Sequence, residues 1–540
     1  MTRPPSESSG SLVYVFLLAL VAALGGLLFG YDTAVIAGAL GFLRLHFDLD
    51  PQYARGWAAA CALLGCAIGA GAAGMLSDLL GRKRVLVLSA IAFFVSALGT
   101  AFPASFVQFI VFRMIGGLGI GAASMSSPMY IAEISPARIR GRMVSVNQFA
   151  IVSGMLIVYF VNYFIAIYGL ERDREAVGSG WSAAATVEPD FARRFIAQYG
   201  PEVDAAKTHR FLEDNRGGLT GEKVSEFLKA ENVTVEPETV ERVRRNEVPW
   251  NEQHGWRWMF GSGALPSLLL LALLFLVPES PRWLTKQGRR DEARRILVRV
   301  GGPQQAEREL REIEEALARE TGSVAQLFEP RMRPALWIGV LLAIFQQITG
   351  INVFLYFATD IFKKMGAGTD AALLQTVLVG AVNLTFTVVA LYTVDRLGRK
   401  PLMLIGFAGM GITLLAMGLA AYFQQTEIWV LLFILGYIGC FALSVGPVTW
   451  VILAEIFPTG IRGRAMAIAT VCLWVANFIV TQTFTMMDSS PWLVSTFRHA
   501  FPYWLYAVIC VAAFLFVFRF VPETKGKSLE EIERGWLEGG

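Results

Sequence analysis

A single carboxylate stands inside a long apolar stretch near the N-terminus. Asp32 is the only charged residue between Leu12 and Leu43, and this run is long enough to cross a bilayer. A charge near the middle of a spanning helix costs about 2.5–3.5 kcal/mol on insertion scales, so such groups commonly serve proton or ion transfer. The residue type and its position favour proton or ion coupling; the alternative is an acid that pairs with a base to hold helices together.

A second set of charged residues occurs twice along the chain, in the same order. Each half contains a Gly-Arg-Lys triplet, an acid seven residues before an Arg-Gly-Arg triplet, and a Pro-Glu pair. Repeated signatures in one order indicate two related halves. We expect these acids and bases to form a gate that pairs across the halves when the inner side is closed; the alternative is charges that only set topology. The predicted gate residues are Asp78, Arg82, Glu133, Arg140, Asp395, Arg399, Glu455 and Arg462.

Composition shows which elements must carry these residues. The chain has 540 residues, of which 54% are hydrophobic and 17% charged, and the charges gather between long apolar runs. This is the pattern of an all-α membrane protein with twelve transmembrane helices in two six-helix, pseudo-symmetric halves. The predicted spans are 12–40, 56–77, 85–102, 106–132, 143–168, 256–277, 334–362, 370–394, 401–423, 428–457, 464–487 and 499–521.

Basic residues set the predicted orientation, and two long loops set the domain boundaries. Arginine and lysine concentrate after the even-numbered spans, which places those loops and both termini in the cytoplasm of a cell (inner) membrane protein. The predicted parts are helices 1–5 (1–168), an extracytoplasmic insertion (169–254), helix 6 (255–277), cytoplasmic linker helices (278–333), the C-terminal half (334–521) and a cytoplasmic tail (522–540).

The insertion holds a faint calcium-loop pattern, EDNRGGLTGE. Leu212, Arg216 and Lys223 occupy its ligand positions, so a capped helical hairpin is the preferred interpretation. The five cysteines lie in apolar runs at unrelated spacings, which is typical of packing residues. We therefore expect neither a metal nor a cofactor.

Longer motifs carry a resemblance to a known family. Combined, they are similar to those of the sugar porter family of the major facilitator superfamily over nearly the whole chain, except the 169–254 insertion. The motifs are GGLLFGYDTAVIAGAL, DLLGRKR, FRMIGGLGIG, SPMYIAEISPARIRGR, VPESPRWL, FQQITGINVFLYFA, VDRLGRKPL, GPVTWVILAEIFPTGIRGRA and FVPETKGKSLEEIE.

The resemblance implies a role for Asp32 and a partner for it. In proton-coupled sugar porters the matching acid is the protonation site, and the arginine that partners it matches Arg113. Asp32 lies about 20 residues into an outward-going helix and Arg113 about seven into an inward-going one, so both fall in the outer half of the membrane. The opposite charge favours the ionised carboxylate, and protonation would release Arg113. A purely structural bridge is the alternative.

The resemblance also implies a sugar site near the membrane midplane. Amides suit sugar hydroxyls because they both donate and accept hydrogen bonds, and aromatic faces stack on C–H surfaces. Helix–helix packing is the alternative role for these side chains. The residues that match the family's sugar ligands are Gln346, Gln347, Asn352, Asn383, Trp450 and Trp474, with Tyr356 and Phe29 as weaker additions.

Two positions depart from the xylose-type pattern within that family. Met155 and Leu473 stand where that pattern has glutamines, and both are expected to face the cavity. Replacing two amides by apolar side chains removes hydrogen bonds to hydroxyls. The substrate is therefore left open between xylose and related monosaccharides.

The leading hypothesis is a proton-coupled monosaccharide symporter that works by alternating access. The alternatives are a facilitative sugar or polyol (inositol-like) transporter and a membrane sugar sensor that uses the insertion for interactions. An enzyme is not expected, because no nucleophile–base or metal-ligand spacing is present. The expected partners are a small-molecule sugar, protons and the lipid bilayer. A net charge of +3 does not indicate binding to nucleic acid. A monomer is expected.

Overall fold

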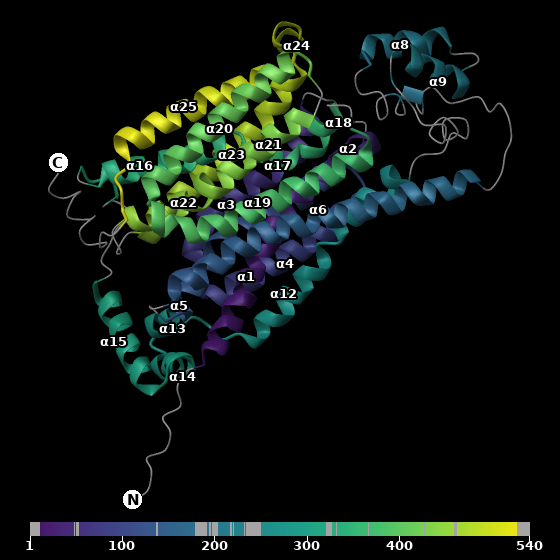
Figure 1. The fold of residues 1–540 in the computed structure, drawn as a ribbon. Coiled ribbons are helices and arrows are strands. Elements are labelled where there is room, and N and C mark those ends of the chain that lie inside the picture. Colours follow the sequence, from purple (N-terminus) through teal and green to yellow (C-terminus); the bar gives the residue numbers. More distant parts are fainter. Residues whose placement is uncertain are drawn as a thin grey trace, which may run out of the picture.

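The computed structural model is a bundle of long helices with a smaller helical hairpin beside it (Figure 1). It describes residues 11–47, 49, 53–136, 139–178, 192–193, 196, 203–215, 219, 221–231, 233, 250–319, 327–330, 332–364, 367–425, 428–457 and 462–525.

The first half contains the predicted first six spans. Its helices are α1 (Leu12–Ala34), α2 (Ile36–Phe47), α3 (Ala54–Leu80), α4 (Arg82–Ala101), α5 (Phe106–Ile134), α6 (Arg140–Gly178), the π-helix η1 (Asn251–Gly255), α11 (Trp256–Gly261) and α12 (Ala264–Leu276). Helix α6 continues ten residues past position 168. The first residues of the predicted insertion thus extend a spanning helix.

The second half follows three linker helices. The linker helices are α13 (Pro281–Lys286), α14 (Arg290–Gly301) and α15 (Pro303–Arg319). The second half comprises α16 (Arg333–Ile348), α17 (Ile351–Tyr356), α18 (Ala358–Lys364), α19 (Thr369–Leu397), α20 (Arg399–Tyr422), α21 (Ile428–Cys440), the π-helix η3 (Phe441–Val445), α22 (Gly446–Ile456), α23 (Arg462–Ser489), α24 (Pro491–Phe497) and α25 (Phe501–Phe520).

Twelve helical segments in the described part of the chain are long and apolar enough to cross a membrane, which confirms the predicted number. Helices suit this setting because lipid offers no hydrogen-bond partner for the backbone. Serines cap two of the spans: Ser11 accepts a hydrogen bond from the Tyr14 amide, and Ser105 accepts one from the Gln108 amide.

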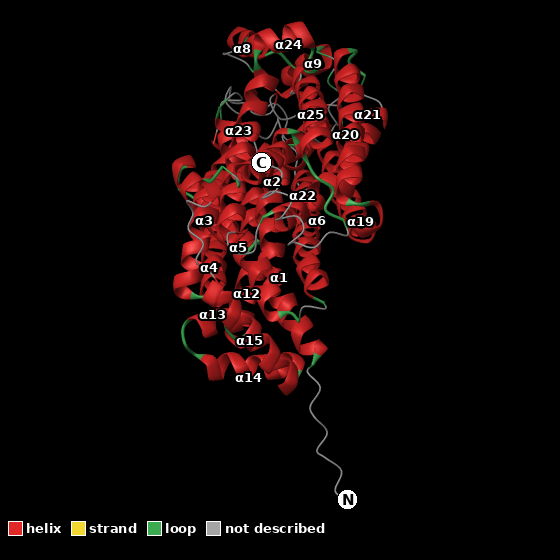
Figure 2. Cartoon of the chain, turned by 90° about the vertical axis from the view of Figure 1, so that its left-hand side faces the viewer, coloured by secondary structure: helices red, strands yellow, loops and turns green. Residues whose placement is uncertain are grey.

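The bundle has two ends that can be told apart by what lies there. Figure 2 shows α8 (Ala205–Asp214), α9 (Gly221–Ala230) and α24 at one end and α13–α15 at the other. We call these the insertion end and the linker end. The first described residue lies at the linker end, since the Ser11 amide donates to the Arg299 carbonyl of α14 at 3.1 Å.

The insertion forms a small core of its own. Phe211 of α8 stacks on Phe227 of α9 with ring centroids 4.2 Å apart, above buried Val224 and Leu228. Asp204 caps α8 by accepting from the Ala206 amide at 2.9 Å. The hairpin interpretation fits these helices; most of the loop between them, 216–218 and 220, lies outside the described residues.

Small residues bring α3 and α5 into backbone contact. A methyl group on Gly117 would collide with the Ala62 carbonyl, and one on Gly65 would collide with the Met114 carbonyl. Membrane helices associate closely where such small residues line the interface. This close approach positions α5, and with it Arg113, against the rest of the first half.

The span predicted at 334–362 is broken into three helices. Gly350 has φ +93°, a left-handed conformation that ends α16 and starts α17 in a new direction. Phe357 then separates α17 from α18. In the tenth span the π-helix η3 interrupts the α-helical pattern while the backbone at both of its ends stays right-handed.

We expect Gly117→Ala to destabilise the protein, because its new methyl group must push two backbones apart; overpacking of this kind costs about 1–3 kcal/mol. The matched control is Gly74→Ala, since Gly74 has nothing within 4 Å of the added methyl group. Thermal unfolding in detergent should show a lower midpoint for Gly117→Ala and an unchanged or higher one for Gly74→Ala. Equal midpoints would contradict the backbone contact.

Candidate functional site

Asp32 and Arg113 form an ion pair inside the first half. Arg113 Nη1 lies 2.9 Å from Asp32 Oδ2 and donates a second hydrogen bond to the Asp32 carbonyl at 3.2 Å. The Arg113 side chain is 1% exposed, whereas that of Asp32 is 16% exposed. A buried charge without its partner is strongly destabilising, so each residue requires the other in this conformation.

Three predicted sugar-site amides form a chain around the break at Gly350. Asn352 donates to Gln347 Oε1, Gln347 donates to Gln346 Oε1 at 3.3 Å, and Gln346 donates to the Gly446 carbonyl at 2.9 Å. That carbonyl stands where η3 passes into α22. The broken helix and the π-helix thus orient amides that lie far from solvent.

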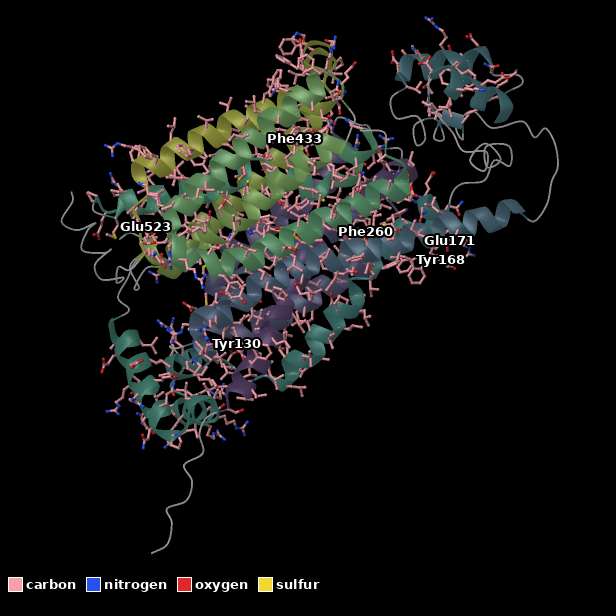
Figure 3. The ribbon with its side chains drawn as sticks, in the orientation of Figure 1. Tyr130, Tyr168, Glu171, Phe260, Phe433 and Glu523 are labelled. Carbon is pink, nitrogen blue, oxygen red and sulfur yellow. The ribbon has the colours of Figure 1, made fainter. Side chains whose placement is uncertain are left out.

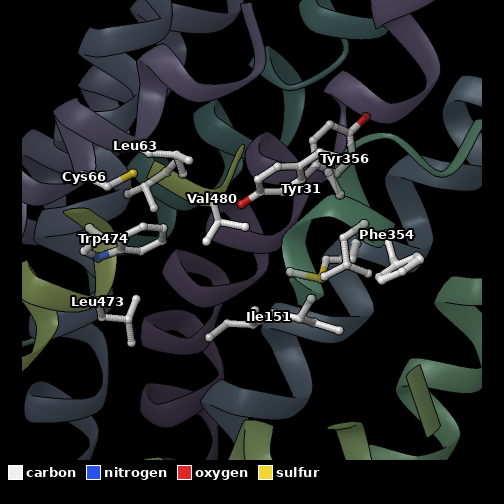
Figure 4. Packing of buried hydrophobic residues seen from close by; sticks show 14 of the residues in the cluster. Tyr31, Leu63, Cys66, Ile151, Phe354, Tyr356, Leu473, Trp474 and Val480 are labelled. Atoms are coloured by element: carbon white, nitrogen blue, oxygen red, sulfur yellow. The ribbon is translucent and has the colours of Figure 1, made fainter. Parts of the chain in front are cut away.

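Two aromatic residues meet across the halves. Phe29 of α1 and Trp474 of α23 have ring centroids 5.5 Å apart. The Trp474 indole nitrogen is buried and has no hydrogen-bond partner, although the side chain belongs to the packed cluster in Figure 4. A buried N–H without a partner is costly, and a ligand hydroxyl would satisfy it.

Another buried amide, Asn477, was missed by the sequence analysis. It lies one turn after Trp474, is 1% exposed, and donates to the Tyr356 hydroxyl at 3.4 Å. Thr481 donates to its Oδ1 at 3.1 Å. An asparagine inside an apolar span was the available signal, but nothing in the sequence indicates which face of α23 it occupies.

The remaining predicted cavity residues lie in different settings. Asn383 of α19 is 3.9 Å from the Met155 sulfur of α6, so this amide faces a weak acceptor across the halves. Leu473 is buried, and Trp450 is half-buried against the main core.

At the linker end, the first-half gate residues form a clamp within their own half. Arg82 pairs with Glu133 at 2.9 Å and with Asp78 at 3.2 Å, and Ser280 donates to the other Glu133 oxygen. Lys286 of the linker also pairs with Asp78 at 3.2 Å. Arg140 is exposed.

The second half repeats this clamp. Arg399 pairs with Glu455 at 2.9 Å, and Thr524 donates to the other Glu455 oxygen at 2.5 Å. Glu523, labelled in Figure 3, accepts from the Arg399 and Lys400 amides. Burial raises the pKa of Glu523, but hydrogen bonds from four backbone amides outweigh it and hold that pKa below its usual value.

Neither clamp crosses from one half to the other. Pairing across the halves was expected when the inner side is closed. Here Arg82 and Arg399 bind acids of their own half, so that expectation stays a prediction about another conformation. The side chains of Asp395 and Arg462 lie outside the described part.

The halves are joined instead at the insertion end, by a contact that the sequence analysis missed. Arg55 in the first turn of α3 forms an ion pair with Asp360 of α18, and both side chains are largely buried. Lys363 lies over the Phe42 ring at 5.6 Å, also across the halves. We call the Arg55–Asp360 pair the latch.

Cations keep the latch acid ionised. Burial raises the pKa of Asp360, but Arg55, Arg44 and Lys363 outweigh it, so the net pKa is below its usual value. Because the pKa of Asp360 is lowered by folding, the latch stabilises the folded protein at pH values above the usual aspartate pKa. This stabilisation is lost only as the pH falls through the lowered pKa of Asp360. Mild acid should leave the latch intact.

Comparisons with known proteins agree with this architecture. A family profile described as "Sugar (and other) transporter" matches residues 18–188 and 243–536. The D-xylose-proton symporter of Escherichia coli is 42% identical over 550 residues, covering 97% of this chain and 96% of the relative. The arabinose-proton symporter of Bacillus subtilis is 37% identical, covering 99% and 97%.

A solved structure extends the likeness to the fold. The proton:xylose symporter bound to 6-bromo-6-deoxy-D-glucose has a TM-score of 0.73 and 42% identity, covering 97% of this chain and 99% of that one. Two repeated six-helix halves with amides buried between them define a membrane carrier. The chain belongs to the sugar porter family of the major facilitator superfamily.

We expect Asp360→Asn to open the insertion end. The substitution removes the acid that binds the buried Arg55. Truncating one partner of such a pair costs about 2–5 kcal/mol, which shifts the ratio of open to closed molecules at least tenfold. Modification rates of a cysteine introduced beside the latch would measure the opening. The control is Asp370→Asn, an exposed acid at the start of α19; equal rates in the two variants would rule out the latch.

Proposed function

We propose that this chain is a proton-coupled monosaccharide symporter that works by alternating access, with xylose or a related sugar as its cargo. The observation that carries the proposal is the Asp32–Arg113 ion pair, which puts a titratable acid inside a spanning helix that also contacts the sugar-site aromatic Trp474 through Phe29. The symporter relatives support the coupling to protons and to a pentose.

The proton acts by changing the charge balance of this pair. With Asp32 ionised, its attraction for Arg113 holds α1 against α5. Protonation removes that attraction and leaves Arg113 with only its hydrogen bond to the Asp32 carbonyl, at 3.2 Å. A shift in these contacts biases the equilibrium between the two rocking positions of the halves.

The sugar would bind by replacing contacts among the protein's own polar groups. The amide chain of Gln346, Gln347 and Asn352 offers both donors and acceptors, and the Trp474 indole offers an unused donor. Because Gln346 and Asn352 lie on either side of the break at Gly350, a sugar held by both would pull α17 toward α16. This movement would link cargo binding to the latch, since α18 follows α17 directly.

The clamps and the latch have different roles in alternating access. Each clamp stays within a half and keeps the ends of its helices together as a rigid unit. The latch joins the halves and must break for the insertion end to open. We place the linker end in the cytoplasm, as the basic loops favour, and assign Asp78, Arg82, Glu133, Arg140, Asp395, Arg399, Glu455 and Arg462 to the inner gate.

A single chain contains every residue of this proposed pathway. The proposed working unit is therefore a monomer in the inner membrane, with no role for nucleic acid. The insertion contributes none of these residues and is proposed to be an accessory domain.

We expect Asp32→Asn to abolish proton-driven accumulation while leaving sugar exchange. Asparagine keeps the size of the side chain but cannot be protonated, so a pH gradient has nothing to act on. Proteoliposomes with an imposed pH gradient and a radiolabelled sugar panel would measure accumulation and exchange separately.

The matched control for this test is Asp370→Asn, which should accumulate sugar like the unaltered protein. Accumulation driven by the pH gradient in Asp32→Asn would contradict the proposed role of Asp32. Uptake by the unaltered protein that ignores a protonophore would indicate a facilitator instead.

We expect Met155→Gln to strengthen the binding of xylose. A new amide beside Asn383 can make one more hydrogen bond, worth about 0.5–1.5 kcal/mol, so KM for xylose should fall about two- to tenfold. Met155→Leu, which keeps the volume and the apolar character, should change KM less than twofold. If both variants have the same KM, Met155 does not face the cargo.

A further inference from the structure

A small pocket lies against Asp32 on a face of α1 that does not meet the other half. Leu28, Tyr31, Asp32 and Val35 follow one another at helical spacing and line it. The opposite wall comes from α4, α11 and α12. Its lining includes Ala97, Phe260, Gly263 and Ser267, around a narrow space with room for about one water molecule.

The sugar-site contact of α1 lies elsewhere on the helix. Phe29, which does not line the pocket, reaches Trp474 of the second half. All the residues that line the pocket belong to the first half. Asp32 is thus accessible from a space that the sugar-site amides of α16 and α17 do not line.

The walls of the pocket offer hydrogen-bond acceptors. Ser262 donates its hydroxyl proton to the Met259 carbonyl at 2.6 Å, so in its 2.7 Å contact with Tyr31 the tyrosine must be the donor. Ser267 donates its proton to the Gly263 carbonyl at 2.6 Å. With these protons committed, the Tyr31 and Ser267 oxygens and the Asp32 carboxylate can only accept, which suits water or hydronium.

A buried hydroxyl beside Asp32 has no partner. Ser96 of α4 is fully buried and its Oγ makes no hydrogen bond. A methyl group on Gly116 would collide with this oxygen and lie 3.3 Å from Asp32 Oδ2, so both oxygens lie close to the bare backbone of Gly116. A buried hydroxyl is normally satisfied, and a water shared with Asp32 would satisfy this one.

We propose that Asp32 gains and loses its proton through water held in this pocket between α1, α4 and α12, by a route separate from the sugar cavity. Tyr31 and Ser267 line the pocket and are the positioning residues that hold the water, and Ser96 shares this water from beside Asp32. A hydronium ion gives one proton to the carboxylate and leaves as water, so charge and atoms balance. Arg113, which lies over the Phe260 ring at 5.5 Å from its centroid, is released on the neighbouring side. This inference rests on the proposed symport.

The inference can be tested by filling the pocket. A methyl group on Gly263 would lie 3.6 Å from Ala97 and 3.8 Å from the Tyr31 ring, which are ordinary contacts, so Gly263→Ala fits and Gly263→Val fills more of the space. The control is Gly261→Ala, on the same segment but outside the pocket. Sugar-driven proton uptake and sugar exchange are measured in the same proteoliposomes with an internal pH dye.

The expected result separates the two activities. Gly263→Val should slow sugar-driven proton uptake at least tenfold, and Gly263→Ala and Ser96→Ala about threefold, while exchange stays within twofold of the unaltered protein. Gly261→Ala should change neither. If Gly263→Val also loses exchange, it is misfolded, and the two milder variants decide.

Unchanged proton uptake in Gly263→Ala and Ser96→Ala, with the unaltered protein coupled, would overturn the pocket route and leave the symport intact. An unaltered protein that moves sugar without protons would overturn the proposed function, and the pocket route with it.

Discussion

The ion pair between Asp32 and Arg113 is the constraint on which the rest of the structure depends. A carboxylate and a guanidinium inside a membrane are tolerated when they neutralise each other. Arg113 binds both the Asp32 side chain and the Asp32 carbonyl through Nη1, while its buried Nε makes no hydrogen bond. The arrangement requires α1 and α5 to lie close together, which the backbone contacts of Gly65 and Gly117 make possible from the side of α3.

The other charged contacts are of two kinds: some lie within one half, and one joins the two halves. The two clamps are charge-assisted, lie within one half and use a repeated set of side chains. The latch is the opposite case, because one buried pair connects α3 of the first half to α18 of the second. A carrier needs both kinds, since rigid halves can exchange access to a central site only if the contacts between them break.

Much of the fold could be predicted from the sequence because a membrane restricts it so strongly. Twelve apolar runs became twelve spans, and repeated charged motifs marked two halves. The path inside each span was predicted only in part: a glycine such as Gly350 can open the seventh span, but apolar composition does not reveal the left-handed conformation through which it does so. For the same reason the orientation of Gln346 toward the carbonyl beside η3 was out of reach.

The sequence by itself determined the class of protein, the acid at Asp32 and the side-chain types suited to a sugar, since these follow from hydropathy, charge and motif. Only the tertiary structure decided which groups meet. Arg55 and Asp360 are 305 positions apart, Asn477 and Tyr356 121 apart, and Ser96 faces Asp32 only across the bare Gly116. Such contacts depend on the rotation and tilt of each helix. Side-chain packing sets both, whereas the pattern of apolar residues determines neither.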